Sequence, residues 1–233
     1  MKQLKRLIRP LAESLCPFCL FGHRSYSQYG EDLLLKTFIE KEYPKNYKGF
    51  YVDIGAHHPY RFSNTAYFYK KGWHGINVEP TPTLIKKFYS LRKRDININA
   101  AVGISDEPLV FYLFNEPALN SFDKELALSR ENVKYKIIDK ITIPLEKLSS
   151  ILDKNLPDGT EITFISIDAE GLDFEILKSN DWQKYRPKFI LIEDDIDFDN
   201  MNLSNVYNYL KENGYQLIGK SLITSIYKKR TEK

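Results

Sequence analysis

The sequence is most informative over residues 48–79, KGFYVDIGAHHPYRFSNTAYFYKKGWHGINVE. This stretch contains two short apolar runs, Phe50–Ile54 and Gly75–Val78, which are rich in β-branched or aromatic residues and are bounded by glycine. Such runs are typical of buried strands, and Ser63–Lys71 between them is predicted to form a short helix. A strand–helix–strand unit of this kind belongs to a parallel sheet, in which ligands bind beyond the carboxyl ends of the strands.

The residues that end these two runs indicate a nucleoside site. Gly55 permits a sharp turn and a close approach by a ligand, and Glu79, 24 residues further on, is placed to accept hydrogen bonds from a ribose diol. A dinucleotide site would use G-x-G-x-x-G to bind a pyrophosphate, whereas this turn reads G-A-H-H-P, with a proline that lacks an N–H. A nucleoside without phosphates fits better, and S-adenosylmethionine (SAM) is the common one. The alternative is an ordinary α/β turn followed by a surface glutamate.

Length and composition favour one soluble globular domain. The chain has 233 residues, of which 42% are hydrophobic and 28% are charged, and this length is enough for a sizeable core. The formal net charge of +3 is too small to favour nucleic acid as a partner. No apolar run reaches the roughly 18 residues that indicate a transmembrane helix. We therefore expect a cytoplasmic protein.

Residues 1–24 are predicted to form an N-terminal extension that contains a basic and apolar helix. Its apolar residues fall at helical spacing among lysines and arginines, at Leu4, Leu7, Ile8, Leu11 and Leu15. This helix would pack on the domain or mediate a homo-oligomer, or it would bind peripherally to an anionic membrane and make the protein membrane-associated. Cys16 and Cys19 follow as C-x-x-C, but no second pair is present to complete a zinc site. We therefore expect two reduced thiols there.

A polar cluster opens the next predicted helix, Ser25–Tyr43. Ser27 suits the N-cap, and Gln28, Glu31 and Asp32 follow it closely. The cluster is either a solvated helix start or one wall of a cofactor cleft. The remaining predicted elements continue the α/β pattern. They are a helix from Pro82 to about Arg92 with Thr81 as its N-cap, strand Ile96–Val102, strands Pro108–Phe114 and Tyr135–Ile143, helix Leu145–Asp153, strand Phe164–Ile167, a helix ending at Lys178, strand Phe189–Ile192, helix Asn202–Asn213, and the antiparallel pair Gln216–Ile218 and Leu222–Tyr227.

Seven short motifs occur in order along residues 27–193. They are S-x-x-G-E-D at 27–32, V-D-I-G-A-H-H-P at 52–59, S-N-T at 63–65, K-K-G-W-H-G at 70–75, V-E-P at 78–80, I-D-A-E-G at 167–171 and R-P-x-F-I-L-I-E at 186–193. Together they resemble the FkbM family of SAM-dependent methyltransferases. The resemblance implies an α/β class I methyltransferase fold over residues 25–233. This fold is a Rossmann-like, mostly parallel seven-stranded sheet with helices on both faces and an antiparallel C-terminal strand.

The resemblance also implies a function and a cofactor site. The family mostly O-methylates sugars and natural products, often for surface polysaccharides. We therefore expect a SAM-dependent O-methyltransferase that acts on a sugar hydroxyl of a surface polysaccharide or glycoconjugate. Asp53 and Gly55 would lie at the methionine end of SAM, and Glu79 would hold the ribose. The expected cofactor-binding residues are Gln28, Asp32, Asp53, Gly55, Ala56, Glu79, Pro80 and Ala101.

Methyl transfer to a sugar hydroxyl benefits from a base or a metal, because a protonated hydroxyl is a poor nucleophile. Asp168 follows a predicted central strand, Glu170 lies two residues further on, and His57 lies on the neighbouring loop. We predict that these three residues are catalytic. The alternative for Asp168 is an N-cap of the helix that follows Gly171.

A magnesium site is the competing prediction. Asp168, Asp194 and Asp195 would all project from the carboxyl ends of adjacent strands, where three carboxylates could hold Mg²⁺. The alternative is an acidic surface loop over Glu193–Asp199. We favour the metal-free reaction, because this strand in the FkbM family usually ends in a lone glutamate, which is matched here by Glu193.

Two other classes of function stay open at this point. A nicotinamide-dependent oxidoreductase would share the strand–helix–strand unit, but the missing G-x-G-x-x-G counts against it. A non-catalytic binding protein on the methyltransferase fold is the other alternative, because a fold alone does not determine function.

Overall fold

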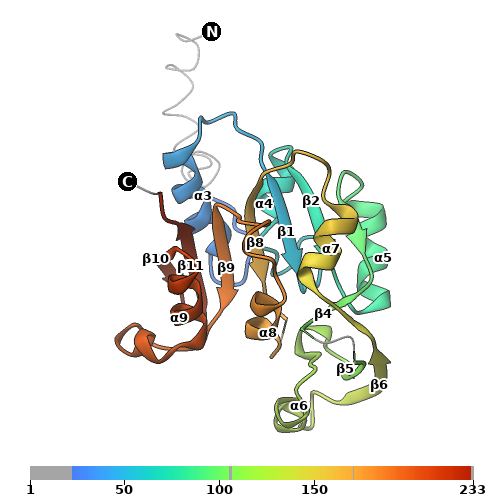
Figure 1. Cartoon of the computed structure of the whole chain (residues 1–233). Helices are drawn as coiled ribbons and strands as arrows, with labels where there is room; N and C mark the ends of the chain where they lie inside the picture. The colour runs from blue at the N-terminus through green and yellow to red at the C-terminus, as the bar shows by residue number, and fades with distance from the viewer. Residues whose placement is uncertain (1–22, 105–106, 170, 232–233) are drawn as a thin grey trace, which may run out of the picture.

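The computed structural model describes residues 23–104, 107–169 and 171–231, and its centre is a seven-stranded sheet with the strand order β10-β11-β9-β8-β1-β2-β3 (Figure 1). Five strands run parallel to one another: β1 (Phe50–Ile54), β2 (His74–Val78), β3 (Ile96–Ile98), β8 (Ile162–Ile167) and β9 (Phe189–Glu193). Strand β11 (Thr224–Lys229) runs antiparallel to both β9 and β10 (Tyr215–Ser221). The predicted sheet, including its antiparallel C-terminal strand, is confirmed.

Helices cover both faces of this sheet because side chains alternate along each strand. In β1, Val52 and Ile54 pack into a core with α7 (Leu148–Asn155), α8 (Asp173–Lys178) and α9 (Asn205–Glu212). Tyr51 points to the other face and packs with α3 (Glu31–Glu42) and α4 (Ala66–Lys70). Every residue of β1 and β8 is buried. The continuous apolar runs in the sequence therefore reflect strands that are covered on both faces.

The predicted strand Ile96–Val102 is wrong as a single element, because the chain divides it between two sheets. Strand β3 ends at Ile98, and β4 (Ala101–Val102) pairs instead with β7 (Leu145–Glu146). Between them, the side-chain amide of Asn99 donates hydrogen bonds to the backbone oxygens of Glu79 (2.8 Å) and Pro80 (2.9 Å). These two bonds tie the break in the strand to the end of β2.

An insertion between β4 and β7 extends beyond the carboxyl end of the sheet, below the arrowhead of β1 in Figure 1. It contains the antiparallel hairpin of β5 (Leu109–Phe114) and β6 (Ile137–Ile143), with a 3-10 helix, η1 (Pro117–Leu119), and α6 (Lys124–Arg130) between the two strands. The two predicted strands are confirmed. The predicted helix Leu145–Asp153 begins instead at Leu148, because Leu145 and Glu146 pair with β4.

Two helix starts also differ from prediction. The N-cap of α3 is Gly30, whose φ of 86° is left-handed, and not Ser27. The predicted helix Asn202–Asn213 is a 3-10 helix, η2 (Phe198–Leu203), followed by α9, whose N-cap Ser204 accepts a hydrogen bond from the Tyr207 N–H. Helix α5 (Pro82–Leu91) has its predicted N-cap Thr81 and a proline in its first turn.

A buried polar network ties α5 to β1 and to the loop after it. The Arg92 side chain is fully buried and pairs with Asp95 at 2.9 Å. It also donates to the backbone oxygen of Pro59 (2.8 Å) and to Thr65 Oγ1 (2.7 Å), and Thr65 in turn donates to Asp53 Oδ2 (2.7 Å). The network therefore fixes the loop that carries His57.

The predictions made for the N-terminal segment lie largely outside the described residues, since its basic helix and Cys16/Cys19 fall within residues 1–22. Within the described ranges, no helix is both long enough and apolar enough to span a bilayer.

Candidate active site

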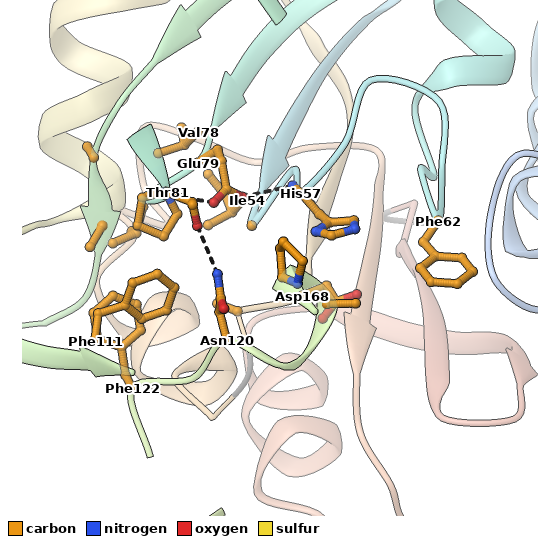
Figure 2. Close-up of a pocket in the computed structure, with 18 of the residues that line it drawn as sticks. Ile54, His57, Phe62, Val78, Glu79, Thr81, Phe111, Asn120, Phe122 and Asp168 are labelled. Carbon is orange, nitrogen blue, oxygen red and sulfur yellow. Dashed lines mark hydrogen bonds between the residues drawn. The ribbon is translucent and has the colours of Figure 1, made fainter. Parts of the chain in front are cut away.

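A pocket with about 760 Å³ of empty space opens at the carboxyl ends of β1, β2 and β8, and the insertion forms its opposite wall (Figure 2). In Figure 2, His57, Phe62 and Asp168 lie on one side of the pocket, and Phe111 and Phe122 lie on the other. Glu79, Thr81 and Asn120 lie between these two groups. An elongated ligand would therefore pass Glu79 with its two ends in different surroundings.

Gly55 holds the ends of three strands together at the floor of this pocket. The backbone N–H groups of Gly55 and Ala56 donate to the backbone oxygen of Val78, at 3.0 and 3.1 Å, and the N–H of Asp168 donates to Ile54 at 3.0 Å. Gly55 has a φ of 75°, and a Cβ at this position would lie 1.8 Å from the backbone oxygen of Asp168. Only glycine fits here, because both the left-handed backbone and the close strand contact exclude a side chain.

Glu79 is a buried carboxylate held by backbone donors. Its side chain accepts hydrogen bonds from the N–H groups of His57 and Thr81, both at 2.8 Å, and the residue is only 4% exposed. Burial raises the pKa of Glu79 to about 7, although the hydrogen bonds from Thr81 and His57 oppose this shift. The Thr81 side chain is a third donor to Glu79, and a carboxylate has about four acceptor sites, so Glu79 can still accept a hydrogen bond from a ligand in the pocket.

His57 combines a strained backbone with an unpartnered nitrogen. Its φ of 52° and the φ of 55° at Phe62 are left-handed, a conformation that non-glycine residues adopt mainly where surrounding contacts impose it. The two rings stack, with centroids 6.3 Å apart. His57 Nε2 is buried and has no hydrogen-bond partner among the described residues. Burial, and then the cations nearby, lower the pKa of His57 to about 4, so the ring is neutral at pH 7 and Nε2 or Nδ1 can accept a proton.

The insertion is anchored to the pocket by Asn120. Its Oδ1 accepts the N–H of Phe114 at 2.8 Å, and its Nδ2 donates to Thr81 Oγ1 at 3.2 Å. The rings of Phe111 and Phe122 stack with centroids 4.3 Å apart and face the pocket beside Ala101. These insertion residues were not predicted as part of the site. The polar loop around Asn120 and Ser121 between two strands was the available signal, because a buried amide there needs partners.

Five of the eight predicted cofactor-binding residues line the pocket, namely Gln28, Gly55, Glu79, Pro80 and Ala101. The other three are engaged elsewhere. The Asp32 carboxylate accepts hydrogen bonds from Ser25 and from the Tyr26 N–H, so it folds the preceding loop onto α3. Asp53 accepts from Thr65 within the Arg92 network, and Ala56 packs against α5. These three residues position the site without lining it.

Two of the three predicted catalytic residues, His57 and Asp168, line the pocket, and Glu170 lies outside the described residues. Asp168 does not cap α8, whose N-cap is Leu172. The carboxylate of Asp173 instead accepts hydrogen bonds from the N–H groups of Ala169 (2.9 Å) and Gly171 (3.3 Å).

The predicted metal set of Asp168, Asp194 and Asp195 is not supported. The described part of the chain contains no group of three histidine, cysteine or acidic side chains that could hold a metal ion. Asp194 turns toward η2 and α9, where its carboxylate accepts a 2.6 Å hydrogen bond from Ser204. Its backbone oxygen accepts from Lys220. Asp194 therefore serves the end of that strand, and neither Asp194 nor Asp195 lines the pocket.

The strand order and the antiparallel β11 define the class I methyltransferase fold. A family model, the methyltransferase FkbM domain, matches residues 53–217, which is more than half of the chain. The protein therefore belongs to the FkbM methyltransferase family, as the motifs indicated. The S-x-x-G-E-D motif at 27–32 lies outside the matched residues.

Two solved structures are similar in outline. A Staphylococcus aureus protein assigned as a caffeoyl-CoA O-methyltransferase has 13% identity and a TM-score of 0.44, with 97% of this chain and 91% of that chain covered. A precorrin-6y C5,15-methyltransferase from Geobacter metallireducens has 12% identity and a TM-score of 0.38, with 83% and 87% covered. No curated protein matches the chain significantly.

Proposed function

We propose that this protein is a SAM-dependent O-methyltransferase that methylates a sugar hydroxyl. The observation that carries the proposal is the pairing, in one pocket, of a fixed carboxylate at the end of β2 with a neutral histidine ring at the end of β1. The carboxylate suits a nucleoside diol, and the ring suits a hydroxyl that must lose a proton. Membership of the FkbM family supports the same reaction.

The residues present fit SAM. Glu79 has an acceptor site left for a ribose hydroxyl. The stacked Phe111 and Phe122 rings beside Ala101 give an apolar surface for the adenine. Gln28 and the glycine turn at Gly55 also line the pocket and would contact the methionine part. SAM, when bound, supplies an electrophilic methyl group on sulfur.

The acceptor hydroxyl would be oriented by His57. Because the low pKa of His57 keeps its ring neutral, it can accept a hydrogen bond from the hydroxyl at any pH from about 5 upwards. A base with a pKa of about 4 takes little proton from a free sugar hydroxyl, but the hydroxyl becomes strongly acidic as the new C–O bond forms. His57 then holds the oxygen in line with the methyl group and receives its proton, and Asp168 faces the same space.

Cofactor binding is tested by calorimetry with SAM and its product S-adenosylhomocysteine. Both should bind, and Glu79→Ala should weaken binding by about 1–3 kcal/mol, because a charged hydrogen-bond partner is lost. Glu146→Ala is a matched control, since Glu146 forms an exposed ion pair with Lys154 outside the pocket. Binding of NADH without binding of SAM would overturn the proposal and favour an oxidoreductase.

Catalysis is tested separately by incubating the protein with methyl-labelled SAM and surface glycans. Label in an alkali-stable ether on a sugar hydroxyl is the expected result. Binding of SAM without transfer to any glycan or small hydroxyl compound would favour the non-catalytic alternative. Full activity in EDTA is also expected, because the reaction proposed here draws on His57 and no metal.

A further inference from the structure

A group of cations surrounds the C-terminal end of α4, and the active site does not use them. We call this group, together with the tyrosine rings that it contacts, the α4 face. It consists of Arg24, Lys36, Lys48, Lys70 and Lys71 with Tyr26, Tyr60 and Tyr67. All of these cations are exposed except Lys36, which is partly buried. The proposed methyl transfer therefore does not account for the α4 face.

One half of the α4 face is built on Tyr26 and Tyr60. The Lys70 ammonium lies 5.4 Å from the centre of the Tyr26 ring and 5.3 Å from the centre of the Tyr60 ring. The Arg24 guanidinium lies 5.0 Å from the centre of the Tyr26 ring. Neither Arg24 nor Lys70 makes an ion pair with a described residue. Two positive charges are therefore held on the same tyrosine with no acidic side chain to neutralise them.

The other half is built on Tyr67. The ammonium groups of Lys36 and Lys71 lie 5.9 and 5.6 Å from the centre of its ring. Lys48 continues this half, because it lies against the turn that follows α4. Among the described residues, the only ion pair in this half joins Lys36 to Glu40, at 3.8 Å. The positive charge therefore extends across the α4 face with little compensation.

The shape of the α4 face decides the kind of partner. None of its residues lines the active-site pocket or the hollow between η2 and α9, so nothing there would enclose and select a small anion. An array of cations suits instead an extended anionic surface, near which each lysine or arginine contributes about fivefold in affinity. Tyrosine suits the same surroundings, because its amphipathic ring favours the level of the lipid headgroups.

The chain that precedes the described residues favours a membrane as this surface. The described part begins at His23, next to Arg24 of the α4 face. Residues 1–22 contain four basic residues and one acidic residue, so they add to the positive charge and do not neutralise it. They also contain the apolar residues at helical spacing noted in the sequence. Stable attachment to a bilayer takes two signals, an apolar one and a polybasic patch, and this chain has both.

We propose that the α4 face binds the surface of an anionic phospholipid bilayer, together with the N-terminal segment. The five cations pair with lipid phosphates, and the three tyrosine rings lie at the level of the headgroups. This interaction is separate from methyl transfer and does not rest on the proposed function.

The test measures how the full chain partitions onto vesicles that contain equal amounts of phosphatidylglycerol and phosphatidylcholine. The wild type should bind these vesicles at least about tenfold more tightly than vesicles of phosphatidylcholine alone. Lys70→Gln combined with Lys71→Gln should weaken binding to the anionic vesicles by at least about tenfold, because two cations are lost. Salt at about 0.5 M should remove most of this difference by screening.

Lys154→Gln combined with Lys184→Gln is the matched control. These two exposed lysines lie beside α7, on the opposite face of the sheet from α4, and the substitutions remove the same charge. Binding should stay within about twofold of the wild type, because charges beyond a Debye length are screened. Urea unfolding of both double variants shows that each is folded.

Three outcomes would overturn the proposal. The wild type would fail to bind the anionic vesicles, or both double variants would weaken binding equally, or neither would. The last result would assign membrane binding to residues 1–22 alone. Binding of heparin without binding of vesicles would be an instance of the first outcome, and it would assign the α4 face to a soluble polyanion.

Discussion

Two buried polar constellations flank the carboxyl end of β1, and they use their side chains differently. In the Arg92 network, each nitrogen of the guanidinium has a partner, and Asp95 accepts from Arg92, Tyr51 and the Gly75 N–H. In the pocket, Glu79 is held by the backbone N–H groups of His57 and Thr81 and by the Thr81 side chain, and His57 Nε2 has no described partner. The first arrangement satisfies its own groups and so builds structure, whereas the second keeps hydrogen-bonding capacity for a ligand.

The same contrast appears in the pKa values of the two carboxylates at the strand ends. Burial raises the pKa of Asp53 to about 6, but Thr65 and Arg92 oppose the shift. Burial raises the pKa of Glu79 to about 7, and only hydrogen bonds from Thr81 and His57 oppose it. A cation therefore steadies the structural carboxylate, and the pocket carboxylate is left easier to protonate.

The largest effect should come from breaking the network. Arg92→Met should destabilise the protein by about 3–5 kcal/mol, because it leaves Asp95 as a buried charge without its cation. Urea unfolding measures the change, and the neighbouring exposed residue gives the control, with Lys93→Met expected within about 0.5 kcal/mol of the wild type. A loss below about 1 kcal/mol for Arg92→Met would show that the two constellations do not differ as described.

The pocket side of the comparison predicts loss of catalysis and not of folding. His57→Ala should lower turnover by about 10²-fold, the lower end for a general base, because its pKa is low. The free energy of unfolding and the SAM affinity of this variant should change little. As a control, His74→Ala, at an exposed site, should leave turnover unchanged. The pH–rate profile of the wild type should show no inflection between pH 6 and 7 that arises from His57, because the pKa of His57 is lowered to about 4. An inflection that disappears in His57→Ala would contradict this assignment.

A comparison of two glycines with similar φ values distinguishes the effect of a steric clash from the effect of backbone strain. Gly55 and Gly159 have φ values of 75° and 70°, but a Cβ on Gly159 would have nothing within 4 Å. Both alanine variants incur the left-handed strain, of about 1–2 kcal/mol. Gly55→Ala should lower the free energy of unfolding by about 1–3 kcal/mol more than Gly159→Ala does, because the ends of β1 and β8 must separate to admit the methyl group. Thermal or urea unfolding measures the difference. Equal losses would mean that β1 and β8 move apart easily.

The smallest effect is a pH dependence of stability. The pKa of Glu79 is raised from 4.5 unfolded to about 7 folded, so the folded state binds the proton more tightly. Stability from this group is therefore complete below pH 4.5 and is lost as pH rises through 7, by about 1–3 kcal/mol. Glu79→Gln should flatten that slope in urea titrations from pH 4.5 to 7.5. Asp53→Asn should flatten the slope only between pH 3.8 and about 6. A wild-type stability that rises over this range would contradict the raised pKa of Glu79.

How far the sequence predicts the site depends on the range of the interactions involved. Phe50–Ile54 was predicted with the observed ends, because a strand buried on both faces leaves a continuous apolar run between polar or glycine positions. Glu79 and Gly55 follow from their positions at strand ends. Asp53 shares that position, but its side chain turns to Thr65, since alternation along the strand directs it away from the pocket. The local sequence V-D-I-G does not indicate whether the Asp53 side chain points toward the pocket or away from it.

The amino-acid sequence alone determined the elements, their α/β alternation, the family and the strand ends at which a ligand would bind. Those features depend on local periodicity and turn chemistry, which can be read within short stretches. Only the tertiary structure decided that the insertion closes the pocket through Asn120 and Thr81, that Arg92 is buried, and that His57 Nε2 has no described partner. Each of these depends on contacts between residues far apart in the chain, or on the absence of such a contact. A local sequence pattern does not specify which residues far apart in the chain come into contact.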